Sequence, residues 1–159
     1  MKKSLPLLIV CFFFFAISIF AQEARKIDEF GDIPCGELLN KSDAANQERY
    51  KTPNSKLFII FYEGKHSQLY FNKKTKELES ILVNPRYGEA RNRAKAITLY
   101  LTKWRKLPKE KLLLFDGGFD KEFRVEIWLL IQNPSLPKPS PTLKRGEIKF
   151  RKGKPPKVR

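Results

Sequence analysis

The chain has only two cysteines and one histidine. Cys11 lies in an apolar N-terminal run that we expect to be removed, which leaves Cys35 without an intramolecular partner. A disulfide framework is therefore excluded. Cys35 is then either buried or paired with another molecule, and burial is favoured because free cysteine packs as a small apolar residue. With His66 as the only histidine, neither a His/Cys metal site nor a Cys–His nucleophile pair is supported.

The common fingerprints of nucleotide-binding and hydrolytic enzymes are also missing. The sequence has no P-loop, no dinucleotide-binding glycine pattern and no GxSxG elbow. We therefore predict a protein that is not an enzyme and that uses no cofactor or metal. One alternative stays open, a small secreted hydrolase or inhibitor built on a glycine turn. It would use the turn of Asp116, Gly117 and Gly118, and its pocket would converge on Asp116, Glu126 and His66.

The N-terminus has the pattern of a secretory signal peptide. Two lysines follow Met1, an almost unbroken apolar run covers residues 5–20, and small Ala21 precedes a charged sequence. The run is shorter than the roughly 20 residues that span a bilayer. We predict cleavage after Ala21 and a periplasmic or extracellular protein. The alternative is a protein anchored by an uncleaved N-terminal segment.

Charge and proline content divide the rest of the chain. The formal net charge is +15, and residues 134–159 hold nine Lys or Arg against one Glu, a net +8, among six prolines. This composition predicts an extended or disordered basic tail. The expected organisation is a signal peptide (1–21), a flexible lead-in (22–32), one α+β domain (33–132) and the tail (133–159).

Hydrophobic periodicity predicts two helices and several strands within the domain. One helix runs from Pro34 to about Tyr50 with Asp32 as its N-cap, and a second follows Pro85 with its apolar face ending at Trp104. The expected strands are 56–62 in the middle of a sheet, a possible hairpin of 68–71 and 78–83, then 111–116 and 123–129. The order predicts helices packed on one face of a small mixed β-sheet with a βαββ-type core, an α+β fold.

Three segments of the second half resemble one known family. RNRAKAITLYL (91–101), KLLLFDGGF (111–119) and FRVEIWLL (123–130) are similar to the outer-membrane protein A-like peptidoglycan-binding domain, and LFIIFYEG (57–64) is similar to its first buried strand. The match covers about residues 56–130. The resemblance implies binding of the carboxylate and amine of diaminopimelate in peptidoglycan through an arginine and an aspartate.

Arg93 falls at the arginine position of that family. The family's aspartate follows the first strand, where this chain has residues 63–67 and no aspartate. The sequence therefore supplies half of the expected ligand pair, and Arg93 is alternatively a solvated helix residue. Asp116, Gly117 and Gly118 form the second candidate ligand site, or alternatively a tight turn that needs positive φ.

The basic tail is the third candidate for binding. Its charge suits an anionic envelope polymer or a membrane surface, and the alternative is a solubilising extension. It lacks the interleaved aromatic residues of a single-strand nucleic-acid platform, because Phe150 is its only aromatic residue. We therefore expect no nucleic-acid partner, and membrane contact only through the signal sequence or the tail.

Overall fold

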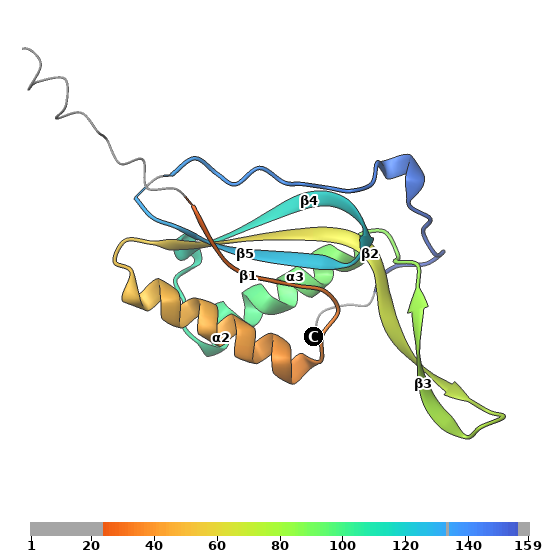
Figure 1. Cartoon of the computed structure of the whole chain (residues 1–159). Coiled ribbons are helices and arrows are strands. Elements are labelled where there is room, and N and C mark those ends of the chain that lie inside the picture. Colours follow the sequence, from red (N-terminus) through yellow and green to blue (C-terminus); the bar gives the residue numbers. More distant parts are fainter. Residues whose placement is uncertain (1–23, 133, 156–159) are drawn as a thin grey trace, which may run out of the picture.

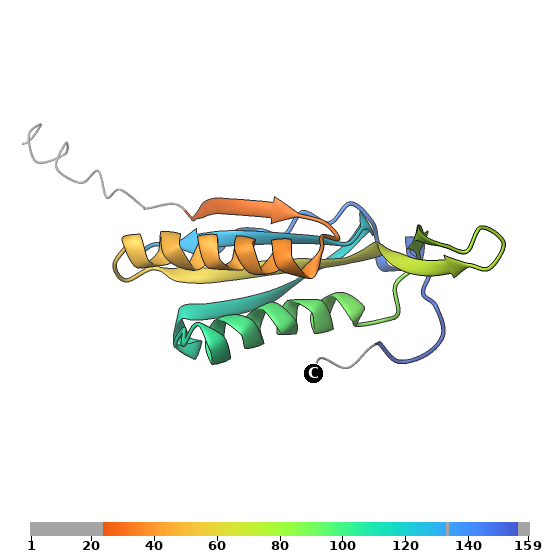
Figure 2. The ribbon, with the colours of Figure 1, turned by 90° about the horizontal axis from the view of Figure 1, so that it is seen from below.

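A computed structural model describes residues 24–132 and 134–155. The domain is an α+β sandwich with both helices on one face of a mixed sheet and the first part of the C-terminal segment on the other (Figures 1 and 2). This confirms the predicted fold class. The helices are α2 (Cys35–Lys51) and α3 (Glu89–Leu99). The strands are β1 (Arg25–Phe30), β2 (Lys56–Asn72), β3 (Glu77–Val83), β4 (Leu112–Glu122) and β5 (Arg124–Leu130).

β2 is the central strand, as its apolar run predicted. Its first half pairs with antiparallel β5 on one side and parallel β4 on the other. The strand does not end at Glu63 and Gly64 as expected but continues to Asn72, where it turns back into β3. The predicted hairpin is therefore present, and it is an extension of the central strand that projects from the domain (Figure 1).

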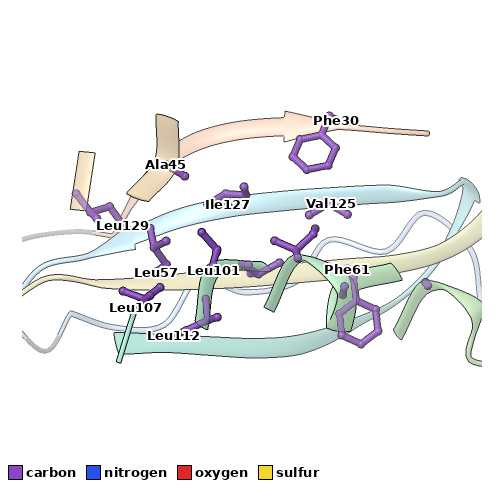
Figure 3. Close-up of a cluster of buried hydrophobic side chains, with 14 of the residues drawn as sticks. Phe30, Ala45, Leu57, Phe61, Leu101, Leu107, Leu112, Val125, Ile127 and Leu129 are labelled. Carbon is purple, nitrogen blue, oxygen red and sulfur yellow. The ribbon is translucent and has the colours of Figure 1, made fainter. Parts of the chain in front are cut away.

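The main core lies between the sheet and the helices (Figure 3). The buried face predicted from the alternation in and before β5 is confirmed, because Phe123, Val125, Ile127 and Leu129 are all buried. Such burial contributes about 1.5–3 kcal/mol for each large apolar side chain. Other members come from β1, α2, β2, α3 and the following segments: Phe30, Ala45, Leu57, Ile59, Phe61, Ala94, Ile97, Leu101 and Leu107.

Residues 22–32 were predicted to be a flexible lead-in, and this is wrong for 25–30. This segment forms β1, an edge strand antiparallel to β5. The register shifts between Lys26 and Asp28, so Ile27 is an extra residue in the ladder. Such a bulge breaks strict alternation, which is why the sequence pattern did not indicate a strand.

Both helices form where they were expected, with a difference at one end of each. Pro34, not Asp32, occupies the N-cap position of α2. α3 passes into a π-helical turn over Tyr100–Trp104. Because a π turn takes up more residues than an α turn, Trp104 is displaced from the apolar face and is 77% exposed, against the prediction. Leu107, just beyond it, is buried instead.

The C-terminal tail is extended as predicted, but residues 134–155 are not disordered. Their first part crosses the face of the sheet opposite the helices, and their last part turns round the edge of the domain to the start of α3, where the Arg151 amide donates to the Pro85 carbonyl (Figure 1). The Ser140 amide donates a hydrogen bond to the Tyr62 hydroxyl (3.1 Å), Arg124 donates to the Ser140 carbonyl (3.0 Å), and Leu143 pairs with Phe119. The tail therefore helps to cover a second, smaller core of Phe58, Ile60, Tyr62 and Leu130.

The predicted signal peptide lies outside the described residues. Among residues 24–132 and 134–155, no helix is long and apolar enough to cross a membrane.

Candidate functional site

An aspartate and an arginine meet where β2 leaves the main sheet. Asp32 follows β1, and Arg93 lies in the second turn of α3. Their side chains form an ion pair between Arg93 Nη1 and Asp32 Oδ1. Asp32 Oδ2 also accepts a hydrogen bond from the Ser67 amide of β2 (2.6 Å). The pair thus connects β1, β2 and α3, and both side chains stay partly exposed, at 20% and 31%.

Apolar groups surround the Asp32–Arg93 pair on its inner side. The Arg93 guanidinium lies over the Phe123 ring, with 5.1 Å between the guanidinium carbon and the ring centroid. A cavity of about 110 Å³ adjoins the pair. It is lined mainly by apolar side chains, among them Phe30, Ile33, Leu38 and Ile97. An ion pair with an apolar wall is screened less by water and salt than an exposed pair.

A polar cluster of buried His66, buried Glu89 and partly buried Arg151 lies next to the pair. His66 Nε2 is 3.2 Å from Glu89 Oε1, and Arg151 reaches the other Glu89 oxygen at 3.6 Å. Burial lowers the pKa of His66, and the nearby Arg93 charge adds to this effect. His66 is therefore neutral near pH 7, which avoids a second positive charge beside Arg93.

Glu63 fixes the start of α3 and so the position of Arg93. Its two carboxylate oxygens accept hydrogen bonds from the backbone amides of Gly88 (2.8 Å) and Ala90 (2.9 Å). These amides belong to the first turn of a helix, whose N–H groups lack partners within the helix. Burial nevertheless raises the pKa of Glu63 to about 6, and the Glu89 and Asp116 carboxylates act in the same direction.

The second predicted site is not a turn at a strand end. β4 continues through Asp116, Gly117 and Gly118 to Glu122, with an irregular register opposite β2. Asp116 is exposed and pairs with Arg91 of α3 (3.3 Å). A Cβ on Gly117 would lie 2.6 Å from the Tyr62 ring, and Gly118 has φ of +95°. The positive φ was expected, but both glycines serve packing and backbone geometry within the strand.

The structure does not bring Asp116, Glu126 and His66 together. Asp116 is in register with Phe61, which faces the helices, whereas Glu126 is in register with Ile60, which faces the tail. The two carboxylates therefore lie on opposite faces of the sheet. Glu126 is buried and accepts hydrogen bonds from Arg124 and from Trp128 Nε1 (2.9 Å). The pocket required by the hydrolase alternative is not formed by these residues.

Cys35 is exposed, against the expectation that it is buried. It is the first residue of α2, and the apolar positions that pack inward begin later in that helix. Among the described residues, no group of three or more His, Cys, Asp or Glu side chains is placed to hold a metal ion.

Asp32 is the residue of this candidate site that the sequence did not reveal. It was interpreted as a helix cap, and the segment expected to carry an aspartate, 63–67, has none. In the structure the Asp32 carboxylate reaches this segment from another part of the chain, through the Ser67 amide. Because Asp32 and Arg93 are 61 positions apart, no local spacing could have paired them.

Comparisons of the chain with protein-family models, curated proteins and solved structures gave no match.

Proposed function

We propose that this protein is an exported, non-enzymatic component of the cell envelope that binds peptidoglycan through the Asp32–Arg93 pair. The observation that carries the proposal is the pairing of these two side chains on one partly exposed rim. The resemblance of residues 56–130 to the outer-membrane protein A-like domain implies such a pair. Arg93 stands at the family's arginine position, and Asp32 takes the role of the aspartate from a different loop.

Both members of the pair have hydrogen-bonding capacity left for a ligand. A guanidinium has five N–H donors, and one nitrogen of Arg93 is engaged by Asp32. A carboxylate offers about four acceptor sites, and those of Asp32 receive Arg93 and the Ser67 amide. The remaining Arg93 donors suit a carboxylate, and the remaining Asp32 acceptors suit an ammonium group. A zwitterionic amino-acid end, such as that of diaminopimelate, presents both groups.

A pull-down with purified peptidoglycan tests this proposal. The predicted mature chain, residues 22–159, contains every described helix and strand and is the form to use. We expect sedimentation with peptidoglycan whose stem peptides carry diaminopimelate. Arg93→Ala should reduce the affinity by about tenfold or more, since hydrogen bonds to charged groups contribute about 1.5–3 kcal/mol. Asp32→Asn should weaken binding in the same direction, because the acceptor for the ammonium group loses its charge.

The matched control is Arg91→Ala. Arg91 lies on the same helix two positions earlier and also pairs with an aspartate, Asp116, but away from the cavity. It should bind as the parent does. Equal retention of the Arg93→Ala and Arg91→Ala proteins would contradict the proposed site. No retention of the parent protein would contradict the proposed function. Peptidoglycan with lysine in place of diaminopimelate tests the ligand assignment, and we expect weaker binding to it.

The attachment of the protein through its tail alone is a second, weaker candidate. The tail is docked, and at least one of its charges is engaged, because Arg151 contacts Glu89, His66 and Gln68. Several tail lysines are exposed and remain able to attract an anionic polymer, among them Lys138, Lys152 and Lys154.

A further inference from the structure

The hairpin of β2 and β3 has one apolar face. Residues directly opposite each other in an antiparallel pair point to the same side, and the side alternates along the strand. The register pairs Phe71 with Leu78, Leu69 with Ser80 and Ser67 with Leu82, so these residues share one face. We call Leu69, Phe71, Leu78 and Leu82 the apolar face of the hairpin. Their exposed fractions are 69%, 52%, 67% and 54%.

The other face of the hairpin is mostly polar. It carries Gln68 opposite Ile81, Tyr70 opposite Glu79 and Asn72 opposite Glu77. The hairpin is therefore an amphipathic ribbon that projects from the domain (Figures 1 and 2). Four large apolar side chains that are more than half exposed on one small ribbon form an interaction surface, because exposed apolar residues of monomeric proteins are usually scattered.

Lysines stand at both ends of the apolar face. Lys73, Lys74 and Lys76 are exposed in the turn at the tip, next to Phe71 and Leu78 in the chain. At the base, a hollow of about 640 Å³ opens beside Leu82. Three exposed lysines help to line this hollow: Lys65, Lys121 and Lys149. Two glutamates, Glu122 and Glu147, line the hollow as well, so its lysines are in excess by one. The apolar face thus lies between the lysines of the tip and a hollow with a small excess of positive charge.

We propose that the apolar face of the hairpin lies on the surface of a lipid bilayer that carries anionic headgroups. Side chains of this kind bury in the boundary between headgroups and acyl chains, while flanking lysines contact the negative headgroups. A two-stranded ribbon has unpaired edges and so cannot cross the hydrocarbon core, but it can lie at the interface, where water and headgroups satisfy the backbone.

The charge of the molecule favours a membrane over a second copy of this chain. A formal net charge of +15 opposes self-association and attracts an anionic surface. A standard protein interface also needs about 800 Å² from each partner, more than four partly exposed side chains provide.

Vesicle co-sedimentation of residues 22–159 tests the inference. We expect binding to vesicles of phosphatidylcholine and phosphatidylglycerol in equal parts, and much weaker binding to phosphatidylcholine alone. The triple variant Leu69→Ser, Phe71→Ser, Leu78→Ser should bind the mixed vesicles at least tenfold more weakly. The control Trp104→Ser removes a large apolar side chain that is 77% exposed on the helical side of the domain, and it should bind as the parent does.

Insertion itself is measured from the difference in tryptophan emission between the Phe71→Trp protein and the parent, which contains Trp104 and Trp128. The added tryptophan should contribute a shift to shorter wavelengths when mixed vesicles are added. A triple variant that binds as tightly as the parent would overturn the inference, because attachment would then be electrostatic only. Unchanged emission of the Phe71→Trp protein would also overturn it. A third result would overturn it as well, namely that the parent forms dimers in solution while the triple variant is monomeric. The apolar face would then be covered by a second copy of the chain. Peptidoglycan retention of the triple variant should not change, which separates this surface from the Asp32–Arg93 pair.

Discussion

Glu63 shows how a single buried side chain serves two needs that conflict. Its carboxylate satisfies the amides of Gly88 and Ala90 at the start of α3. The same burial that places it there disfavours its charged form, and its pKa rises to about 6. The position of Arg93, three residues beyond Ala90, depends on this capping contact because both residues lie in the first two turns of α3.

The raised pKa of Glu63 predicts a pH dependence of stability. A carboxyl group whose pKa is higher in the folded protein stabilises the fold below its ordinary pKa of 4.5, and this contribution is lost as the pH rises through about 6. The loss is about 2 kcal/mol in the free energy of unfolding. Denaturant unfolding of the parent and of Glu63→Gln, compared across this range, measures it.

The difference in the free energy of unfolding between the parent and Glu63→Gln reports on Glu63 alone, because His66 is present in both proteins. His66 acts in the opposite direction: its lowered pKa adds stability that is present above its ordinary pKa of 6.5 and is lost as the pH falls. The prediction would be contradicted if this difference in unfolding free energy stayed constant with pH. It would also be contradicted if NMR showed the Glu63 carboxyl to titrate near its ordinary pKa.

At the scale of elements, three irregularities separate the predicted pattern from the folded one. A bulge at Ile27 hides β1, a π turn displaces Trp104, and β2 continues past the glycine that was expected to end it. The apolar runs and the alternation of β5 were predicted because burial on one or both faces leaves a regular pattern. The irregular positions were missed because each breaks the period on which such a prediction rests.

Gly64 lies where β2 passes the turn between β4 and β5. A Cβ at this position would be 2.2 Å from the Glu122 carbonyl carbon and 2.4 Å from its oxygen, which are backbone atoms that cannot rotate away. Gly64→Ala should therefore lower the free energy of unfolding by about 1–3 kcal/mol or more, the usual effect of overpacking. It should also weaken the proposed binding of peptidoglycan, because the neighbouring Ser67 amide holds Asp32.

Gly36→Ala is the matched control for Gly64→Ala. Gly36 lies in α2 with no atom within 4 Å of an added Cβ, so alanine should stabilise the helix by about 0.5–1 kcal/mol. The free energies of unfolding of both variants are measured by denaturant unfolding. Equal stabilities of the two proteins would show that the close approach at Gly64 is not rigid.

At the scale of the whole molecule, the tail acts as a structural element of the domain. It contacts the sheet through Tyr62, Asp120 and Arg124. It also contacts the edge of the candidate site, where Arg151 lies against Glu89 and donates its amide to the Pro85 carbonyl (2.9 Å). A basic, proline-rich composition indicated an extended chain, but the composition alone does not show that the chain has a surface to pack against.

Removal of residues 133–159 should therefore destabilise the domain. Exposure of two large side chains of the smaller core, such as Tyr62 and Phe58, costs about 3 kcal/mol or more. Thermal unfolding of the truncated chain should show a clearly lower Tm. Replacement of the exposed Lys138, Lys152 and Lys154 by Gln removes charge without removing contacts and should leave the Tm nearly unchanged. A truncated chain as stable as the parent would show that the tail contributes no packing.

The sequence by itself determined the α+β class, the two helices, the central strand, the hairpin and the inward face of β5, because these features follow from local periodicity and turn residues. It also identified Arg93 as a candidate, through a resemblance in its motif. Only the tertiary structure decided that Asp32 is the partner of Arg93, that Asp116 and Glu126 lie on opposite faces, and that the tail is docked. These are contacts between distant parts of the chain. They depend on strand order and bulges, which no short stretch of sequence records.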